Sequence, residues 1–284
     1  MKYALFLGCV IPARLNSYDA ATRRIAEVLG VELVDIEGAI CCSSPDMESM
    51  SEETGLAMAA YNISIAEEMN LDIMVLCNGC NEVLVKANKK LKENKKLQDK
   101  VNNVLADLGR KYNGTIEVKH LVRVLYEDFG VEKIKKKIKK PFKNLKVAVH
   151  YGCHLIKPSE FLMFDNPENP KSLDELVNIT GARSVNYPDK MECCGGPILA
   201  VNEDLSLNIA RSKIEVVKKY ADVIVTACPF CYLQYENCQL LSGEKEQIPV
   251  VLYPQLLGLA LGIDYDDLAL YENRIDASIL LEHL

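Results

Sequence analysis

The sequence predicts an α/β fold made of two similar halves related by duplication, each with a parallel sheet flanked by helices. Three observations predict this fold. Short apolar runs of strand length alternate with helical segments along the chain, which is typical of a parallel sheet with covering helices. A five-cysteine pattern occurs twice in the same order. The residues around each copy also match between the halves, as expected for an internal repeat.

The first half begins with an apolar run, Tyr3 to Gly8, which predicts a strand that ends at Cys9. A helix is expected over about 50–69, where apolar residues recur at a spacing of three and four. Asp72 to Cys77 is another short apolar run and predicts a buried strand. Ile116 to Leu121 predicts a further strand, followed by a helix.

The second half repeats these elements. Lys146 to Gly152 predicts a strand that ends at Cys153, and a helix is expected over about 203–220. Asp222 to Cys228 and Pro249 to Pro254 predict the two later strands. Each half is therefore expected to be Rossmann-like, with alternating strands and helices.

The junction between the halves is expected near Lys140 to Asn144, where a charge run meets a proline before the second copy's first strand. The predicted domains are therefore residues 1–143 and 144–284. This division agrees with the length, because 284 residues exceed a usual single domain of ~100–200. The lysine runs at 86–100 and 133–143 are interpreted as solvated helix faces.

Composition limits the classes of protein that fit. No apolar run approaches the ~18–20 residues of a membrane span, and Met1 to Leu7 is too short for a signal peptide. We therefore expect a cytoplasmic, reducing location, which disfavours a disulfide framework. The net charge is −7, and the basic residues form no nucleic-acid footprint.

Ten of the eleven cysteines belong to the repeated pattern. Thiolates are soft ligands that suit zinc or iron–sulfur clusters. A structural zinc ion or an ordinary cubane cluster needs four, so a fifth thiolate in each group requires an explanation. The first cysteine group is Cys9, Cys41, Cys42, Cys77 and Cys80, and the second cysteine group is Cys153, Cys193, Cys194, Cys228 and Cys231.

The predicted elements bring each cysteine group together. Ligands of parallel α/β sheets bind where strands end and helices begin. Cys80 and Cys231 are expected to open helices, whose N-terminal N–H groups favour thiolate. The adjacent pairs must lie in loops, because neighbouring side chains of a strand point to opposite faces. Ser43-Ser44-Pro45 and Gly195-Gly196-Pro197 follow the pairs and favour irregular backbone. We therefore expect five thiolates around each of two sites.

Three other kinds of thiol site fit the pattern less well. Structural zinc sites usually gather ligands from two close pairs, without a spare cysteine. A thioredoxin-like dithiol needs only the Cys-x-x-Cys segment. The compact cysteine run of ordinary ferredoxin clusters is absent, which points to unusual clusters and to a partner that supplies the electron path.

Histidines near the cysteines have open roles. His154 follows Cys153 and is interpreted either as a hydrogen-bond donor to a sulfur or as a proton donor, because imidazole titrates near neutral pH. His150 is assigned a structural role on its strand. His120 aligns with Tyr253, so the repeat gives these two positions no common chemistry.

Three residues outside the pattern complete the candidates. Cys238 is expected to be a buried apolar residue, since free cysteine packs as a small hydrophobe. Arg211 and Lys213 are placed at the opening of the helix after the second cysteine pair, where they either hold an anionic substrate or lie on a solvated surface.

The sequence resembles the cysteine-rich "CCG" domain family, and within it the B subunits of the heterodisulfide reductases of methanogenic archaea. The resemblance covers essentially the whole chain. One departure is Ser43-Ser44 in place of Gly-Gly after the first pair, which removes no ligand. The segments that carry the resemblance are Tyr151 to His154, Cys193 to Pro197, Cys228 to Cys231 and Gln255 to Gly262.

The resemblance implies that each cysteine group holds a noncubane [4Fe–4S] cluster. It implies an oxidoreductase of methanogenesis whose substrate, the mixed disulfide of coenzyme M and coenzyme B, lies between the clusters and is reduced to two thiols. Each cluster would supply one electron, with His154 as a candidate proton donor. The implied partners are an iron–sulfur C subunit, a bifurcating A subunit with flavin and, through them, a hydrogenase or formate dehydrogenase.

Two alternatives belong to other classes. The chain can be an electron-transfer subunit of a lactate or glycolate oxidation complex, which shares the CCG domain and leaves the mixed disulfide untouched. It can also be a zinc-stabilised interaction module, which would be colourless and free of sulfide.

Overall fold

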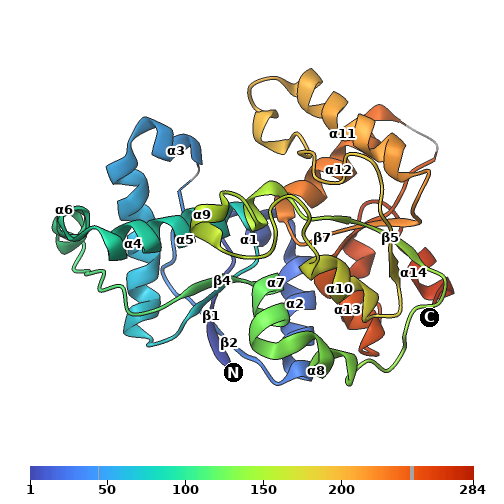
Figure 1. Cartoon of the computed structure of the whole chain (residues 1–284), viewed down its shortest axis with the longest axis horizontal. Coiled ribbons are helices and arrows are strands. Elements are labelled where there is room, and N and C mark those ends of the chain that lie inside the picture. The colour runs from blue at the N-terminus through green and yellow to red at the C-terminus, as the bar shows by residue number, and fades with distance from the viewer. Residues whose placement is uncertain (44, 244–245) are drawn as a thin grey trace.

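The computed structural model of the chain describes residues 1–43, 45–243 and 246–284. It contains two four-stranded sheets with the same strand order, β2-β1-β3-β4 and β6-β5-β7-β8. Every strand pair is parallel. The predicted α/β fold with two similar halves is confirmed (Figure 1).

The predicted strands correspond to six of the eight observed ones. The two that the sequence analysis missed, β2 and β6, each pair with the first strand of their half. The strands are β1 Lys2–Phe6, β2 Glu32–Asp35, β3 Ile73–Val75 and β4 Val118–His120, then β5 Lys146–His150, β6 Arg183–Ser184, β7 Val223–Thr226 and β8 Val250–Leu252.

The helices of the first half begin and end for local reasons. The long helix α4 starts where the Ser51 hydroxyl accepts a hydrogen bond from the Thr54 N–H, which caps it. The helices are α1 Val10–Arg14, α2 Asn16–Leu29, α3 Pro45–Met50, α4 Glu52–Glu68, α5 Asn78–Glu93, α6 Lys95–Ala106, α7 Leu121–Arg123, the π-helical turn Val124–Gly130 and α8 Val131–Lys135.

The second half has a matching helix, α11, capped by the Asn202 side chain, which accepts from the Leu205 N–H. Its helical elements are the 3-10 turn Cys153–Leu155, α9 Ser159–Leu162, α10 Ser172–Asn178, the 3-10 turn Gly196–Ile198, α11 Glu203–Val217, α12 Pro229–Ser242, α13 Tyr253–Ala260, the 3-10 turn Leu270–Glu272 and α14 Ile279–Glu282.

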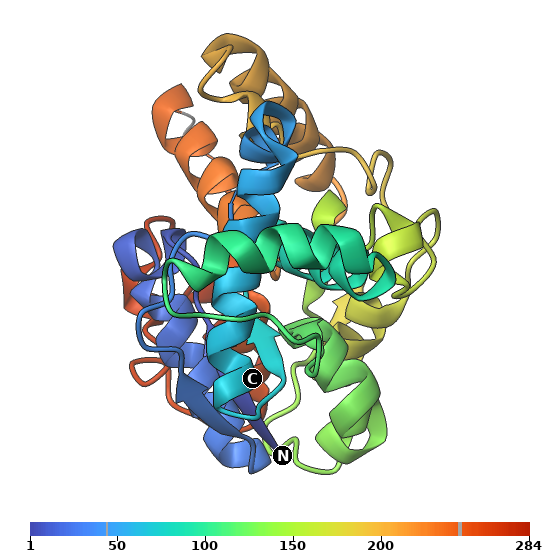
Figure 2. The same ribbon diagram turned by 90° about the vertical axis from the view of Figure 1, so that its left-hand side faces the viewer.

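The largest hydrophobic core runs through both halves. It joins buried side chains of β1 and α2 to those of β5, β7 and α13, and α2 packs against α13. The buried Tyr18 hydroxyl of α2 donates to the Ala227 carbonyl at the end of β7, at 2.7 Å. A second core lies within the first half under α4 and α5, with α6 crossing α4 (Figure 2).

The two sheets are built from residues 2–120 and 146–252, on either side of the predicted junction at Lys140 to Asn144. Because the main core crosses between the halves, the division of the chain into domains at residue 143 stays a prediction. In the part of the chain that the structure describes, no helix has both the length and the apolar character needed to cross a membrane.

Candidate metal centres

The cysteines lie at the switch point of each sheet. In the order β2-β1-β3-β4, the chain leaves β1 and β3 toward opposite edges, and ligands of such sheets bind outside the carboxyl ends of those two strands. Cys9 follows β1 and Cys77 follows β3, while Cys153 and Cys228 follow β5 and β7. The placement predicted from the sequence is therefore observed.

Helix starts hold the Cys-x-x-Cys segments. Cys77 is the N-cap of α5 and Cys228 the N-cap of α12, so Cys80 and Cys231 lie in the first helical turn, as predicted. The N-terminal N–H groups there favour negative charge on sulfur. The adjacent pairs, Cys41-Cys42 and Cys193-Cys194, lie in irregular segments, also as predicted.

The thiols of each cysteine group form a continuous chain of side-chain contacts. In the first group the Sγ atoms of Cys42 and Cys80 are 3.2 Å apart. The contacts run Cys9–Cys41–Cys42–Cys80–Cys77 in the first group and Cys153–Cys193–Cys194–Cys231–Cys228 in the second, the same order in both. The structure thus brings together all five thiols of each group.

Exposure follows the same pattern in both groups. The strand-end cysteine and the first member of the pair are exposed, and the other three are buried. Each site therefore has a buried side, which excludes water, and an open side, which solvent reaches. The exposed thiols are those of Cys9, Cys41, Cys153 and Cys193.

The two groups meet at one point. A side-chain hydrogen bond links Cys77 of the first group to Cys228 of the second. Hydrogen bonds from Cys228 and then Cys80 lower the pKa of Cys77 well below its usual value, and a hydrogen bond from Cys153 lowers the pKa of Cys193 to about 2. The contact between the groups could not be predicted from the repeat alone.

Glycines at the strand ends lie next to the thiols, with no side chain between backbone and sulfur. Gly8 and Gly152 have φ of +68° and +70°, which favours glycine. A Cβ on Gly8 would lie 2.9 Å from Cys80 Sγ, and one on Gly152 would lie 3.3 Å from Cys231 Sγ. The equivalent glycines therefore leave the room that sulfur ligands need.

The first residue after each cysteine pair has a similar positive φ, although one is serine and the other glycine. Ser43 has φ 78°, close to the 83° of Gly195. Ser44, the second residue of the departure from Gly-Gly, lies outside the described residues. The Gly195 N–H donates to Cys193 Sγ at 3.3 Å, so backbone amides of this loop stabilise the sulfur.

His154 lies beside a carboxylate of the other half. Its Nδ1 is 3.6 Å from Oε2 of Glu82, a buried residue of α5. Interaction with Glu82 raises the pKa of His154 above its usual value, against the effect of burial. Sequence reasoning missed Glu82, whose only signal was its position two residues after Cys80.

The structure corrects the interpretation of Arg211 and Lys213. The helix α11 begins at Glu203, so neither residue opens it. Arg211 is exposed, as expected of a solvated residue. Lys213 is only 4% exposed, so the solvated-surface interpretation was wrong for it, and its Nζ donates to the carbonyls of Lys190 and Glu192 at 3.0 and 2.7 Å.

Cys238 and His150 are both buried, and His150 lies next to the second cysteine group. Cys238 is buried, as predicted. His150 lies buried on β5, but the structure adds a contact that its structural assignment lacks: a ring nitrogen and the Sγ atoms of Cys194 and Cys231 all lie within 4.8 Å of one another.

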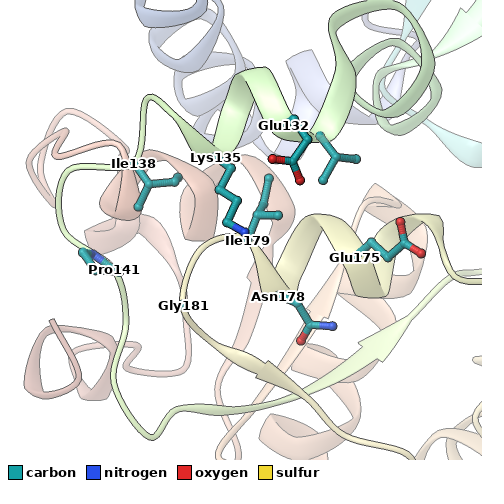
Figure 3. A pocket seen from close by; sticks show the side chains of 9 residues that line it. Glu132, Lys135, Ile138, Pro141, Glu175, Asn178, Ile179 and Gly181 are labelled. Carbon is teal, nitrogen blue, oxygen red and sulfur yellow. The ribbon is translucent and has the colours of Figure 1, made fainter.

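Two surface hollows are lined by residues other than the cysteines. One of about 630 Å³ lies between α8 and α10, where Glu132, Lys135 and Glu175 line it (Figure 3). Another of about 340 Å³ lies beside α5 and Phe161.

The residues of both sites fit iron–sulfur clusters. Five converging thiols are a soft donor set, suited to iron or zinc rather than magnesium. Buried polar atoms without a hydrogen-bond partner, in the part of the chain that is described, include several around these thiols: Asn78 Oδ1, Glu82 Oε2, His150 Nε2 and His154 Nδ1. Buried polar atoms without a hydrogen-bond partner are rare in native proteins, and here several lie around the thiols.

Fold and site together define a duplicated α/β protein with two adjoining groups of five cysteines. The family model described as "CCG: Cysteine-rich domain" matches residues 3–84 and 147–236, one match in each half. The chain therefore belongs to the CCG family of cysteine-rich domain proteins.

Individual relatives extend this likeness. The chain is 42% identical over 282 residues to the B subunit of the ferredoxin:CoB-CoM heterodisulfide reductase of Methanosarcina mazei, covering 96% of this chain and 94% of the relative. It is 36% identical over 284 residues to "8-methylmenaquinol:fumarate reductase membrane anchor subunit" of Wolinella succinogenes, covering 98% and 99%. More distant relatives are named iron–sulfur proteins, which supports iron–sulfur clusters in this chain.

A solved structure supports the fold. "Crystal structure of a hypothetical protein from Helicobacter pylori" matches with a TM-score of 0.76 at 18% identity, covering 96% of this chain and 51% of that chain. The present chain thus spans about half of that protein, and the likeness concerns the fold alone.

Proposed function

We propose that this chain is the B subunit of a CoB–CoM heterodisulfide reductase, and that each cysteine group holds one noncubane [4Fe–4S] cluster. The names and near-complete coverage of two relatives at 42% and 43% identity support this assignment. The fifth thiol in each group supports it too, since a cubane cluster needs four. The proposed domains, 1–143 and 144–284, each carry one cluster.

The observation that carries the proposal is the contact between the two groups through Cys77 and Cys228. Reduction of a disulfide consumes two electrons and two protons and converts one S–S bond into two S–H groups. An iron–sulfur cluster generally passes one electron at a time, so two adjoining clusters supply the pair. The two clusters of the repeat would therefore supply the two electrons that reduction of one disulfide requires.

The chain's own residues shape the site around this chemistry. The exposed thiols of Cys9, Cys41, Cys153 and Cys193 mark the open side of both groups, where a disulfide can approach. The buried thiols lie on the closed side, where water is excluded, and the Cβ positions of the two strand-end glycines face two of these sulfurs. A low dielectric there strengthens every charge interaction.

Protons come from the same boundary between the halves. His154 follows an exposed cysteine, and its imidazole lies 3.6 Å from the Glu82 carboxylate. The raised pKa of His154 keeps its imidazole protonated to a higher pH than a free histidine, so it can hold a proton for a leaving thiolate. The Glu82 carboxylate favours the protonated form of the ring.

Electrons reach the chain from partners. We propose that the C subunit, which holds iron–sulfur clusters, and the A subunit, which holds flavin, deliver them, with a hydrogenase or formate dehydrogenase behind. The relatives are named as subunits, which supports a complex of several chains.

The test is reduction of the coenzyme M–coenzyme B disulfide by reduced methyl viologen, with the anaerobically purified chain. We expect turnover by the unmodified protein, and loss of at least about a hundredfold in Cys42→Ser and Cys194→Ser, because each removes a cluster ligand. Cys238→Ser is the matched control and should retain activity. Full activity of Cys194→Ser would contradict the proposal.

A second candidate is an electron-transfer subunit that serves a flavoprotein and does not act on a disulfide. The 36% identity to the Wolinella succinogenes fumarate reductase subunit over nearly the whole of both chains favours it. The same assay separates the two, since an electron-transfer subunit would hold reducible clusters and leave the mixed disulfide intact.

A further inference from the structure

The two metal centres differ at two equivalent positions of the repeat. The first position lies two residues before the strand-end glycine, where the first half has Phe6 and the second half has His150. The second position lies equally far along α4 and α11 from the capping residues, where the halves have Asn62 and Lys213. Each pair can therefore be compared directly.

Asn62 and Lys213 perform the same structural task with different charge. Asn62 accepts from the Ile40 N–H at 2.9 Å and donates to the Cys41 carbonyl, so it holds the loop that carries the first pair. Lys213 holds the loop of the second pair through the carbonyls of Lys190 and Glu192. Both side chains hold the loop of a cysteine pair, but only the second half has a cationic side chain at this position.

Lys213 keeps its charge next to the second cysteine group. Burial lowers its pKa to about 8, while the nearby thiolates of Cys231 and Cys194 raise it. The two hydrogen bonds that Nζ donates and the negative groups nearby favour the charged ammonium. Its two hydrogen-bond acceptors are neutral carbonyls, and the charged groups that act on it are the Glu192 carboxylate and the thiols of Cys231, Cys194 and Cys193.

His150 adds a hydrogen-bond donor to the same centre. Its Nδ1 lies 3.3 Å from the Tyr235 hydroxyl, and burial raises the pKa of Tyr235 well above its usual value, so the hydroxyl stays a donor. A ring nitrogen of His150 lies within 4.8 Å of Cys194 Sγ and Cys231 Sγ. Nε2 has no hydrogen-bond partner among the described residues, so we assign the ring proton to Nε2 with the Tyr235 hydroxyl donating to Nδ1. Phe6 offers only ring carbon at the equivalent place.

We propose that Lys213 and His150 make the second cluster the more easily reduced of the two. A positive charge and an N–H donor near the sulfurs both stabilise the additional electron, and such contacts set iron–sulfur potentials. Asn62 and Phe6 supply neither to the first cluster. Electrons that enter the chain therefore settle first on the second centre. This inference rests on the two clusters of the proposed function.

The test is an anaerobic redox titration followed by electron paramagnetic resonance. Lys213→Gln removes the charge and keeps an amide donor, Lys213→Arg keeps the charge, and Lys219→Gln removes an exposed charge close to the end of the same helix. The second cluster's signal is the one lost in Cys231→Ser. In Lys213→Gln, its reduced-to-oxidised ratio at fixed potential should fall at least about tenfold, equal to ~59 mV for one electron.

The controls separate the possible failures. Lys213→Arg and Lys219→Gln should titrate like the unmodified protein, and His150→Phe should lower the same midpoint as Lys213→Gln. If Lys213→Gln loses iron and cannot be titrated, the midpoint of the second cluster in His150→Phe tests the inference instead. Unchanged midpoints in the variants, or a shift of the first cluster's signal, would overturn the inference. An unmodified protein without two cluster signals would instead overturn the proposed function.

Discussion

At the scale of single residues, the strand-end glycines leave space for the sulfur ligands. A methyl group on Gly152 would lie 2.5 Å from Asn78 Nδ2, on a backbone with φ +70°. Asn78 in turn donates to the Tyr151 carbonyl at 2.7 Å and joins the two halves beside the thiols. Because Gly152 has no side chain, both the Cys231 thiol and the Asn78 amide can lie next to the backbone at this point.

Substitution of either glycine should therefore impair cluster loading. We expect Gly8→Ala and Gly152→Ala to lose at least half of their iron, because the added Cβ displaces Cys80 in one variant and Asn78 and Cys231 in the other. Iron analysis of the anaerobically purified variants checks this. Gly38→Ala has a similar positive φ with open space around it and is the matched control. Full iron in Gly152→Ala would refute the steric argument.

At Ser43 we predict that a substitution stabilises the protein. A residue other than glycine at φ 78° costs about 1 kcal/mol, so Ser43→Gly should raise the free energy of unfolding by about that amount. The reciprocal variant, Gly195→Ser, should be destabilised, because its Cβ would lie 2.6 Å from the Ser206 carbonyl oxygen. Denaturant unfolding of both variants measures this, and a loss of stability in Ser43→Gly would contradict it.

The His154–Glu82 pair is tested by the pH profile of disulfide reduction. His154→Gln and Glu82→Gln should each slow turnover by about a hundredfold or more, the usual contribution of a positioned acid. Because Glu82 raises the pKa of His154, Glu82→Gln should move the alkaline limb of the profile to lower pH. Iron content should stay unchanged in both. An unchanged profile would remove His154 from the reaction.

At the scale of elements, the repeat allowed the long apolar elements to be predicted and left the rest hidden. The strands that bear cysteines and the helices α4 and α11 were within a few residues of their observed bounds. β6 has two residues, too few for a periodic pattern, and β2 is a half-exposed edge strand. Lys213 was misplaced because the sequence does not show that α11 turns this position inward.

The contact of α2 with the end of β7 joins the two halves. The Tyr18 hydroxyl is fully buried and donates to the Ala227 carbonyl, next to Cys228. We expect Tyr18→Phe to lower the free energy of unfolding by about 1 kcal/mol, since it removes a buried hydrogen bond. Tyr220→Phe, at an exposed tyrosine, is the control. Equal stability of the two variants would show that this bond does not hold the halves together.

At the scale of the whole molecule, two copies of one fold place their metal centres against each other. The grouping of the ten cysteines followed from the sequence, because spacing and repetition were enough to assign each one to its group. That the groups meet through Cys77 and Cys228 did not follow, because a repeat gives no relative orientation of its copies. The shared core fixes that orientation and makes the halves one unit.

Iron and acid-labile sulfide analysis of the anaerobically purified chain tests the central claim most directly. Two [4Fe–4S] clusters predict about eight irons and as many sulfides per chain, falling to about half in Cys194→Ser and unchanged in Cys238→Ser. A colourless protein that contains zinc and no sulfide, or one with about four irons whose content does not respond to Cys194→Ser, would contradict the account.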